Sequence, residues 1–133
     1  MTIALNTNRQ EVIHAMVSFT QAGLTLQDGT VESAITVPQG AIVVGGGIVI
    51  DTAFDSTTSD TLTVGDGGVA ARYVGSVDGQ TAGYTALVPT GYEYPAQDTV
   101  DVGNTQVGGA GSAGEGRLLL SYVVNGRAAF SQD

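Results

Sequence analysis

Hydrophobic and polar residues alternate along most of this chain, which is the pattern of half-buried β-strands. Residues 30–37 (TVESAITV) place every second side chain on one face and end at Pro38, which has no N–H group for a sheet ladder. Valine and threonine dominate these segments, and both favour a pleated backbone over a helix. The pattern predicts about eight or nine short strands. The other candidate strands are residues 11–20, 41–54, 61–64, 69–74, 83–88, 99–102 and 117–124.

The first of these segments, residues 11–20 (EVIHAMVSFT), fits two different periods. A period of two places Ile13 and Val17 together on the cleaner face of a strand. A helix would instead bring Val12 and Met16 together on one side. We predict a strand, with the helix as the alternative.

Glycines interrupt two of the later segments. Three consecutive glycines at 45–47 break the candidate strand 41–54, at a place where a backbone without side chains can bulge or cross closely over a neighbour. We expect a sharp bend there and place Val49, beyond it, in the core. Residues 103–116 (GNTQVGGAGSAGEG) are rich in glycine and hold little to bury, which predicts a mobile loop.

The two ends of the chain carry different signals. Residues 1–10 end in a polar run (NTNRQ) and predict a free N-terminal arm, which leaves residues 11–133 as one domain. Asn125-Gly126 is a strong hairpin signal and predicts that residues 122–124 pair with residues 127–130. Turns separate the strands at intervals of roughly 8 to 12 residues, and no connection is long and helical. The sequence therefore predicts an all-β antiparallel sandwich or barrel.

Composition narrows the function classes. The chain has 133 residues, no cysteine and a net charge of −9, with thirteen acidic residues against four basic ones. The absence of cysteine excludes disulfides, zinc–thiolate sites and thiol nucleophiles. The negative field repels phosphate backbones and anionic membranes, so we expect neither nucleic acid nor a membrane as a partner. The apolar window at residues 41–50 is about half the length that a membrane-spanning helix requires.

Catalytic and cofactor-binding motifs are weak in this sequence. His14 is the only histidine, and no G-x-S-x-G elbow accompanies it. Without lysine, a phosphate-binding P-loop is impossible. Calcium binding by loop carboxylates is a weaker alternative to ordinary turn hydrogen bonds at these positions. We predict no enzyme activity, no metal and no cofactor. The loop carboxylates are Asp51, Asp55, Asp60 and Asp66.

Arginine and tyrosine residues are the best candidates for contacts with other proteins. Each arginine is a rare positive charge that can pair with a carboxylate of the same or a neighbouring subunit. The tyrosines near Pro89 and Pro95 can anchor an interface or pack within a loop. The polar arm contributes further candidates. The predicted interface residues are Asn6, Arg9, Arg72, Tyr84, Tyr92, Tyr94, Arg117 and Arg127.

Residues 35–74 also carry a recognisable series of motifs. An I-T-V-P-x-G-A entry leads into a valine-rich strand, then D-T-A-F-D-S-x-T-S-D-T-L-T-V-G-D-G and an A-R-Y exit. This series resembles small virion proteins of tailed bacteriophages, among them head decoration (cement) proteins and related jelly-roll components. The resemblance implies a jelly-roll-like β-sandwich that works by adhesion, without an active site, on the outside of an icosahedral shell.

The partners implied by this resemblance are the major capsid protein and further copies of the chain. A homotrimer is preferred and a homodimer is the alternative, because shells offer many three-fold positions. We expect the protein to be made in the host cytoplasm and to reside on the capsid exterior. The competing interpretation is a fibre or tail module that binds a receptor or carbohydrate through Tyr84, Tyr92, Tyr94 and the glycine-rich loop.

Overall fold

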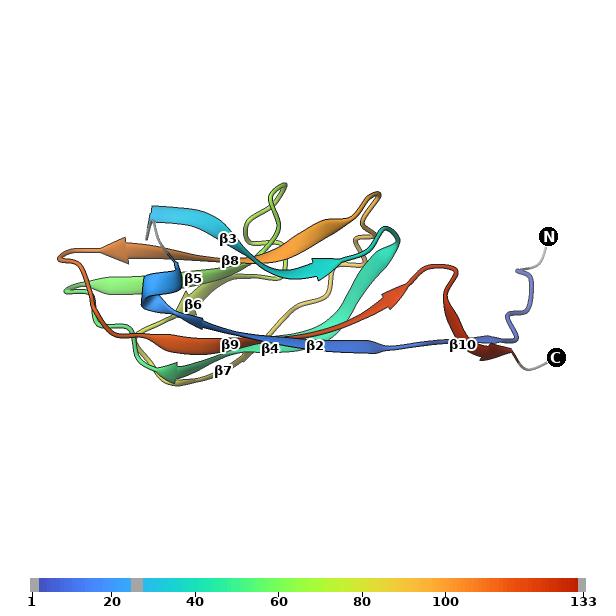
Figure 1. Ribbon diagram of the computed structural model, residues 1–133, viewed down its shortest axis with the longest axis horizontal. Coiled ribbons are helices and arrows are strands. Elements are labelled where there is room, and N and C mark those ends of the chain that lie inside the picture. The colour runs from blue at the N-terminus through green and yellow to red at the C-terminus, as the bar shows by residue number, and fades with distance from the viewer. Residues whose placement is uncertain (1–2, 25–27, 132–133) are drawn as a thin grey trace.

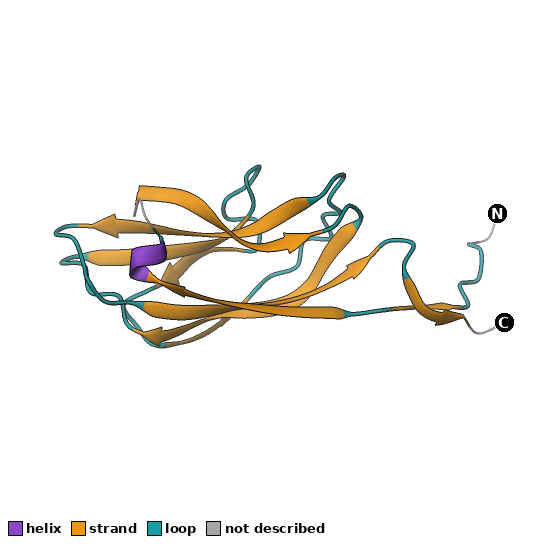
Figure 2. Ribbon diagram, viewed as in Figure 1, coloured by secondary structure: helices purple, strands orange, loops and turns teal. Residues whose placement is uncertain are grey.

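Two four-stranded antiparallel sheets pack face to face in the computed structural model, which describes residues 3–24 and 28–131 (Figure 1). A two-stranded ribbon extends from one end of this sandwich (Figure 2). Among the described residues the one helical element is the 3-10 turn η1 (Gln21–Gly23), and none of their helices is long enough to cross a membrane. The strands are β1 (Asn8–Gln10), β2 (Ile13–Thr20), β3 (Asp28–Val37), β4 (Ala41–Thr52), β5 (Ser59–Gly65), β6 (Val74–Asp78), β7 (Gly83–Ala86), β8 (Asp98–Val107), β9 (Glu115–Val124) and β10 (Ala128–Ser131).

The strand order is that of a jelly roll. One sheet runs β2-β9-β4-β7 and the other runs β3-β8-β5-β6, with antiparallel pairing throughout. Strands that follow one another in the chain therefore mostly cross between the sheets, as in the double Greek key of jelly-roll domains. The predictions of an all-β sandwich and of a jelly-roll-like order are confirmed, and residues 13–20 are a strand rather than a helix.

The core lies between the two sheets. Its centre is formed by the inward side chains of the middle strands β4, β8 and β9, such as Ile48, Val100 and Leu118, each with no exposed surface. Burial of each such side chain is worth roughly 1.5–3 kcal/mol. Tyr73 and Tyr94 add the two largest fully buried side chains. The sandwich thus has a continuous apolar interior that needs no disulfide.

A β-bulge in β4 corrects the prediction that Val49 belongs to the core. Val43 pairs with Tyr122 and Gly45 with Ser121, so Val44 is an extra residue without a partner in β9. One extra residue moves every later side chain to the opposite face. Uninterrupted alternation from Val43 would point Val49 inward, whereas the bulge points Ile48 and Ile50 inward and turns Val49 outward.

Half of the glycine-rich segment 103–116 is strand, contrary to the prediction of one continuous mobile loop, and the connection is confined to residues 108–114. β8 continues to Val107 and β9 already begins at Glu115. Asn104 is 1% exposed, and its Nδ2 donates to Oδ1 of the buried Asp60 at 3.0 Å. Gly103 fits between β3 and β5, where a Cβ would press against Val31 and Thr63. Glycine therefore serves close packing here, a role that composition alone does not show.

Two further predictions fail, one for a local reason and one because of a long-range strand pairing. The segment 69–74 is a loop up to residue 73, because Asp66 accepts hydrogen bonds from the N–H groups of Gly68 and Val69 at 3.0 and 2.8 Å. The turn at Asn125-Gly126 does form, with φ +83° at Gly126, but the strand after it does not return onto β9. β10 pairs with β1 instead. Residues 8–10 of the predicted free arm are thus one strand of a ribbon.

Candidate interaction surfaces

The outer face of the β2-β9-β4-β7 sheet combines exposed apolar side chains with polar ones and few charges. The register places Met16, Leu119, Gly47 and Ala86 in one cross-strand row. The next row contains Ser18, Arg117, Val49 and Tyr84, which come from the same four strands. Met16 is 60% exposed and Tyr84 is 62% exposed. We call this surface the weakly charged face, defined by Met16, Leu119, Val49, Tyr84 and Arg117.

The two sheets carry very different charges. The strands of β2-β9-β4-β7 contain only two carboxylates and one arginine, Asp51, Glu115 and Arg117. The strands of the other sheet contain no basic residue and six acidic ones, which are Asp28, Glu32, Asp60, Asp78, Asp98 and Asp101. Six of the thirteen acidic residues therefore belong to the strands of one layer of the sandwich, and one of them, Asp60, is buried on the inward face of β5. Because buried interface regions are depleted in charged residues, the other layer is the better contact surface.

Two of the predicted interface residues lie on the weakly charged face. The guanidinium of Arg117 donates from Nε and Nη2 to the two carboxylate oxygens of Asp51, at 2.9 and 3.0 Å. This hydrogen-bonded pair lowers the pKa of Asp51. The ring of Tyr84 covers Gly47, and its hydroxyl donates to the carbonyl of Gly46 at 3.1 Å. Both residues are thus held on the sheet surface, with Tyr84 open to a partner.

Three other predicted residues meet inside a loop cluster. Arg72 donates from Nε and Nη2 to Asp66, at 2.5 and 3.2 Å, and its guanidinium carbon lies 3.6 Å from the ring centroid of Tyr92. Tyr92 packs edge-on against Tyr94, with ring centroids 5.0 Å apart. Tyr94 has no exposed surface, and its hydroxyl lies 2.8 Å from that of Tyr73. Of the two roles expected for these tyrosines, loop packing is the one that Tyr94 fulfils.

Electrostatics in this cluster favour one protonation state. Burial raises the pKa of Asp66, but hydrogen bonds from Arg72, the Val69 N–H and Tyr94 outweigh it, so the pKa lies below its ordinary value. Burial, followed by the hydrogen bonds with Tyr73 and Asp66, raises the pKa of Tyr94 far above its usual range. Asp66 is therefore an ionised acceptor and Tyr94 a protonated donor. The negative charge of Asp66 is thus balanced within the cluster by Arg72.

The remaining predicted residues lie at the ribbon end of the molecule. β1 and β10 pair there beyond the sandwich, next to both described chain ends (Figure 1). Arg127 forms an ion pair with Glu11 at 3.3 Å, in which both side chains are about half exposed. The guanidinium of Arg9 donates to the carbonyl of Asn8 at 3.2 Å, and Oδ1 of Asn6 accepts from the Asn8 N–H at 2.9 Å. Asn6 and Arg9 thus stay on the surface.

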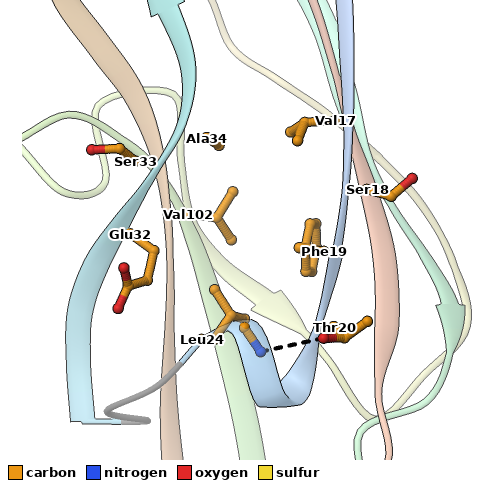
Figure 3. A pocket seen from close by; sticks show the side chains of 10 residues that line it. Val17, Ser18, Phe19, Thr20, Leu24, Glu32, Ser33, Ala34 and Val102 are labelled. Atoms are coloured by element: carbon orange, nitrogen blue, oxygen red, sulfur yellow. Dashed lines mark hydrogen bonds between the residues drawn. The ribbon is translucent and has the colours of Figure 1, made fainter.

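An apolar hollow opens along one side of the sandwich. It lies between β2 and β3, which are edge strands of the two sheets, and has a volume of about 300 Å³. Figure 3 shows Val17 and Phe19 of β2 pointing toward Ala34 of β3 and Val102 of β8. Leu24 closes one end, just after η1, where the Thr20 hydroxyl accepts from the Gly23 N–H at 3.2 Å.

The residues considered for chemistry have ordinary partners. Nδ1 of His14 lies 2.8 Å from the Ser121 hydroxyl on the exposed sheet surface. Oδ1 of Asp55 accepts from the N–H groups of Ser112 and Ala113 at 2.7 and 2.9 Å. Within residues 3–24 and 28–131, no group of three or more histidine or acidic side chains is placed to hold a metal ion. The hydrogen bonds of His14 and Asp55 join residues that are far apart in the chain, so these side chains act in tertiary contacts.

No model of a protein family and no curated protein sequence matches this chain. Three solved structures do match. A chain of the cyanophage Pam1 capsid asymmetric unit aligns with a TM-score of 0.67 and 18% identity, over 93% of this chain and 92% of that one. A chain of the acid-stable capsid of Helicobacter pylori bacteriophage KHP30 aligns with a TM-score of 0.68 and 14% identity, over 90% and 94%. A chain of the Ralstonia phage GP4 capsid aligns with a TM-score of 0.62 and 18% identity, over 96% and 92%.

What this chain shares with them is its fold. Because nearly all of both chains is aligned in each case, the three phage chains are about as long as this one. The weakly charged face and the hollow were both missed by reasoning from the sequence. One signal for the face was present, since Leu118, Leu119 and Leu120 put apolar side chains on both faces of β9. The hollow had no such signal, because it depends on how two edge strands far apart in sequence come together.

Proposed function

We propose that this chain is a virion structural protein that decorates and stabilises the outside of an icosahedral phage capsid. In this proposal the chain has no catalytic activity and acts through protein–protein contacts. It is made in the host cytoplasm and joins the particle by binding the major capsid protein. The observation that carries the proposal is the likeness in fold, over at least 90% of the chain, to chains of three phage capsid structures.

The size of the chain supports an accessory role in a shell. A single 133-residue sandwich buries its own core and leaves one sheet face and one edge for contacts. The aligned chains in the three capsid structures are of similar length. A small rigid module of this kind is suited to bind a surface that larger subunits have already formed.

The charge distribution supports the direction of attachment. In the proposal the weakly charged face lies against the capsid, and the acidic β3-β8-β5-β6 sheet faces the solvent. Acidic residues on the outer layer keep neighbouring copies soluble and leave packaged nucleic acid unattractive as a partner. Met16, Leu119 and Tyr84 would supply the apolar contacts, and the paired Arg117 would supply directional hydrogen bonds.

Stabilisation of a shell by such a module follows from multivalency. One copy that touches two capsid subunits joins them, and an oligomer on a symmetry axis joins several at once. Each contact can remain weak, because dissociation requires all of them to break together. A homotrimer is the preferred assembly and a homodimer the alternative.

The structure weakens the alternative of a receptor-binding or carbohydrate-binding tail module. That interpretation needs Tyr84, Tyr92, Tyr94 and the glycine-rich loop on one surface. Tyr94 is buried near the start of β4, where its N–H donates to the carbonyl of Ala41 at 3.0 Å. Residues 108–114 lie beyond the other end of β4, which is roughly 40 Å long. These elements cannot form one recognition surface.

The test is the protein composition of purified particles of the phage that carries this gene. We expect the chain in a near-stoichiometric ratio to the major shell protein, and we expect particles that lack it to lose their genome at a lower temperature. A ratio lower by tenfold or more would favour the tail module. Absence of the chain from the particles would refute a virion role altogether.

A further inference from the structure

The segment before the ribbon presents two apolar side chains that no described part of the chain covers. Ile3 and Leu5 are 93% and 96% exposed, and they are the most exposed large hydrophobic residues among those described. They are two residues apart, so an extended backbone would put both on the same side. The ribbon that follows has only two strands, and an isolated two-stranded ribbon is marginally stable in water. Both features indicate a segment that is completed by a partner.

The hollow between β2 and β3 is an apolar space that no described side chain fills. The inward residues of the central strands are fully buried, but those of β2 are only half-buried along its whole length. β2 pairs only with β9 and β3 only with β8, so each has a second edge whose backbone groups are unpaired within its sheet. Ala34 lies at a bulge of β3 and leaves space in front of Val17 and Phe19 (Figure 3). The core is thus covered less completely along this edge than at its centre.

The two features lie too far apart to meet within one molecule. β2 runs from Ile13 at the ribbon end to Thr20 at the end with η1 (Figure 1). Asn8 is held in place by the pairing of β1 with β10. Nine extended residues lead from Asn8 to Val17, which corresponds to about 30 Å. The five residues from Ile3 to Thr7 span about 17 Å. A second copy of the chain must therefore supply either the segment or the hollow.

The charges of the two parts are complementary. Arg9 is the one charged residue in the described segment 3–10, and Glu32 is the one charged residue among the described residues that line the hollow. The strand β3 adds Asp28 at the same end of the sandwich. Approach of the segment to this edge is therefore electrostatically favourable, and it should weaken with salt.

We propose that residues 3–7 of one copy bind in extended form along the β2–β3 edge of a second copy, with Ile3 and Leu5 in the hollow between Val17, Phe19 and Ala34. The backbone of the segment adds a strand to a free sheet edge, and the alternate side chains complete the core. The contact joins different surfaces of the two copies, so repeating it closes into a ring when the rotation permits. It accounts for self-association, which the proposed binding to a shell does not require.

Disulfide trapping between purified chains tests the contact directly, because the natural sequence has no cysteine. Chains with Leu5→Cys and chains with Ala34→Cys are mixed under mild oxidation and separated on a non-reducing gel. We expect a mixed disulfide to form rapidly. The matched control replaces Ala34→Cys with Val88→Cys, at a position that is 65% exposed on a segment that does not line the hollow. Equal yields for the two mixtures would overturn the proposal.

Sedimentation of the full-length chain provides the second measurement. We expect the unmodified chain to self-associate, and the double variant Ile3→Ser, Leu5→Ser to associate more than about tenfold more weakly, because both side chains lose apolar burial. The melting temperature of the variant monomer should be unchanged, since both residues are exposed. Val88→Ser is the control for loss of an exposed hydrophobic residue.

Three results would overturn the proposal. The first is that the unmodified chain stays monomeric up to millimolar concentration. The second is that the double variant associates as well as the unmodified chain. The third is that the chain is a monomer in which Ile3 and Leu5 are needed only for binding to particles. The last result would mean that residues 3–7 bind the shell rather than a second copy of the chain. Because sedimentation uses no particles, failure here leaves the test of the virion role unaffected.

Discussion

The hydroxyl of Tyr94 donates a hydrogen bond to Oδ2 of Asp66 at 2.9 Å, and this bond ties together two loops that are 28 residues apart in the chain. Arg72, which lies in the same β5–β6 loop as Asp66, donates hydrogen bonds to the same carboxylate. The connection holds the β5–β6 loop against the segment that precedes β8. Residues that looked like surface anchors in the sequence therefore stabilise the end of the sandwich from within.

Replacement of Tyr94 by Phe should destabilise the fold by about 1–3 kcal/mol, because the buried Tyr73 hydroxyl and Asp66 each lose a partner. The measurement is urea unfolding at neutral pH. Tyr84→Phe removes a hydroxyl of the same kind from a side chain that is 62% exposed, and it should change stability by less than about 0.5 kcal/mol. Equal effects of the two substitutions would contradict a structural role of the Tyr94 hydroxyl.

Asp66 should make the fold sensitive to acid. Its pKa is lowered in the folded state, so its contribution is complete above the unfolded value of about 3.9 and is lost as the pH falls through the folded pKa. Asp66→Asn should cost about 1.5–3 kcal/mol at pH 7 and remove this part of the acid transition. The measurement compares denaturation curves of the unmodified chain and the variant between about pH 2 and about pH 7. This interval reaches about two pH units below the ordinary Asp pKa. An unchanged acid midpoint in the variant would be inconsistent with this role.

Asp101 should act in the opposite direction. Burial raises its pKa, and the negative charges of Asp98 and Asp66 raise it further, against the hydrogen bond from Thr99. Its ionised form therefore destabilises the fold, with no effect below the unfolded pKa and the full effect above the folded one. Asp101→Asn should raise stability at pH 7 and leave it unchanged near pH 3, below the ordinary Asp pKa of about 3.9. A loss of stability at neutral pH would show that the carboxylate has a stabilising partner.

Gly46 should be the sensitive member of the triple glycine. Its φ is +125°, and a Cβ there would collide with the carbonyl oxygen of Leu119 on β9. Gly46→Ala should cost more than about 2 kcal/mol from strain and forced separation of the strands. Gly45→Ala meets open space and should be neutral or stabilising by up to about 1 kcal/mol. Thermal melting distinguishes the two, and similar losses at both positions would refute the proposed close approach.

Val49 and Ile48 allow folding to be separated from attachment. Ile48→Asp buries an unpaired charge and should prevent folding at ambient temperature, since the side chain has no exposed surface. Val49→Asp lies on the weakly charged face beside Arg117 and should fold normally. Under the proposed function it should also reduce binding to the shell. Circular dichroism and a particle-binding assay check both parts, and a Val49→Asp variant that fails to fold would restore the original prediction of a core position.

Local sequence patterns accounted for most of the strands. The alternation in residues 30–37 and the stop at Pro38 match β3, and residues 117–124 lie within β9. These features depend on neighbouring residues, so they are visible without the rest of the chain. The candidate contact residues fared differently, because Arg72, Tyr92 and Tyr94 converge on Asp66 only when two separate loops meet.

The sequence by itself determined that this protein is an acidic, all-β chain with turns at short intervals, because backbone preference and alternation are local properties. Only the tertiary structure decided the jelly-roll order, the outward position of Val49 and the pairing of β1 with β10. Strand pairing joins residues far apart in the chain, and both faces of β4 are apolar, so alternation alone does not show which face turns inward. One unpaired residue, Val44, settles that choice.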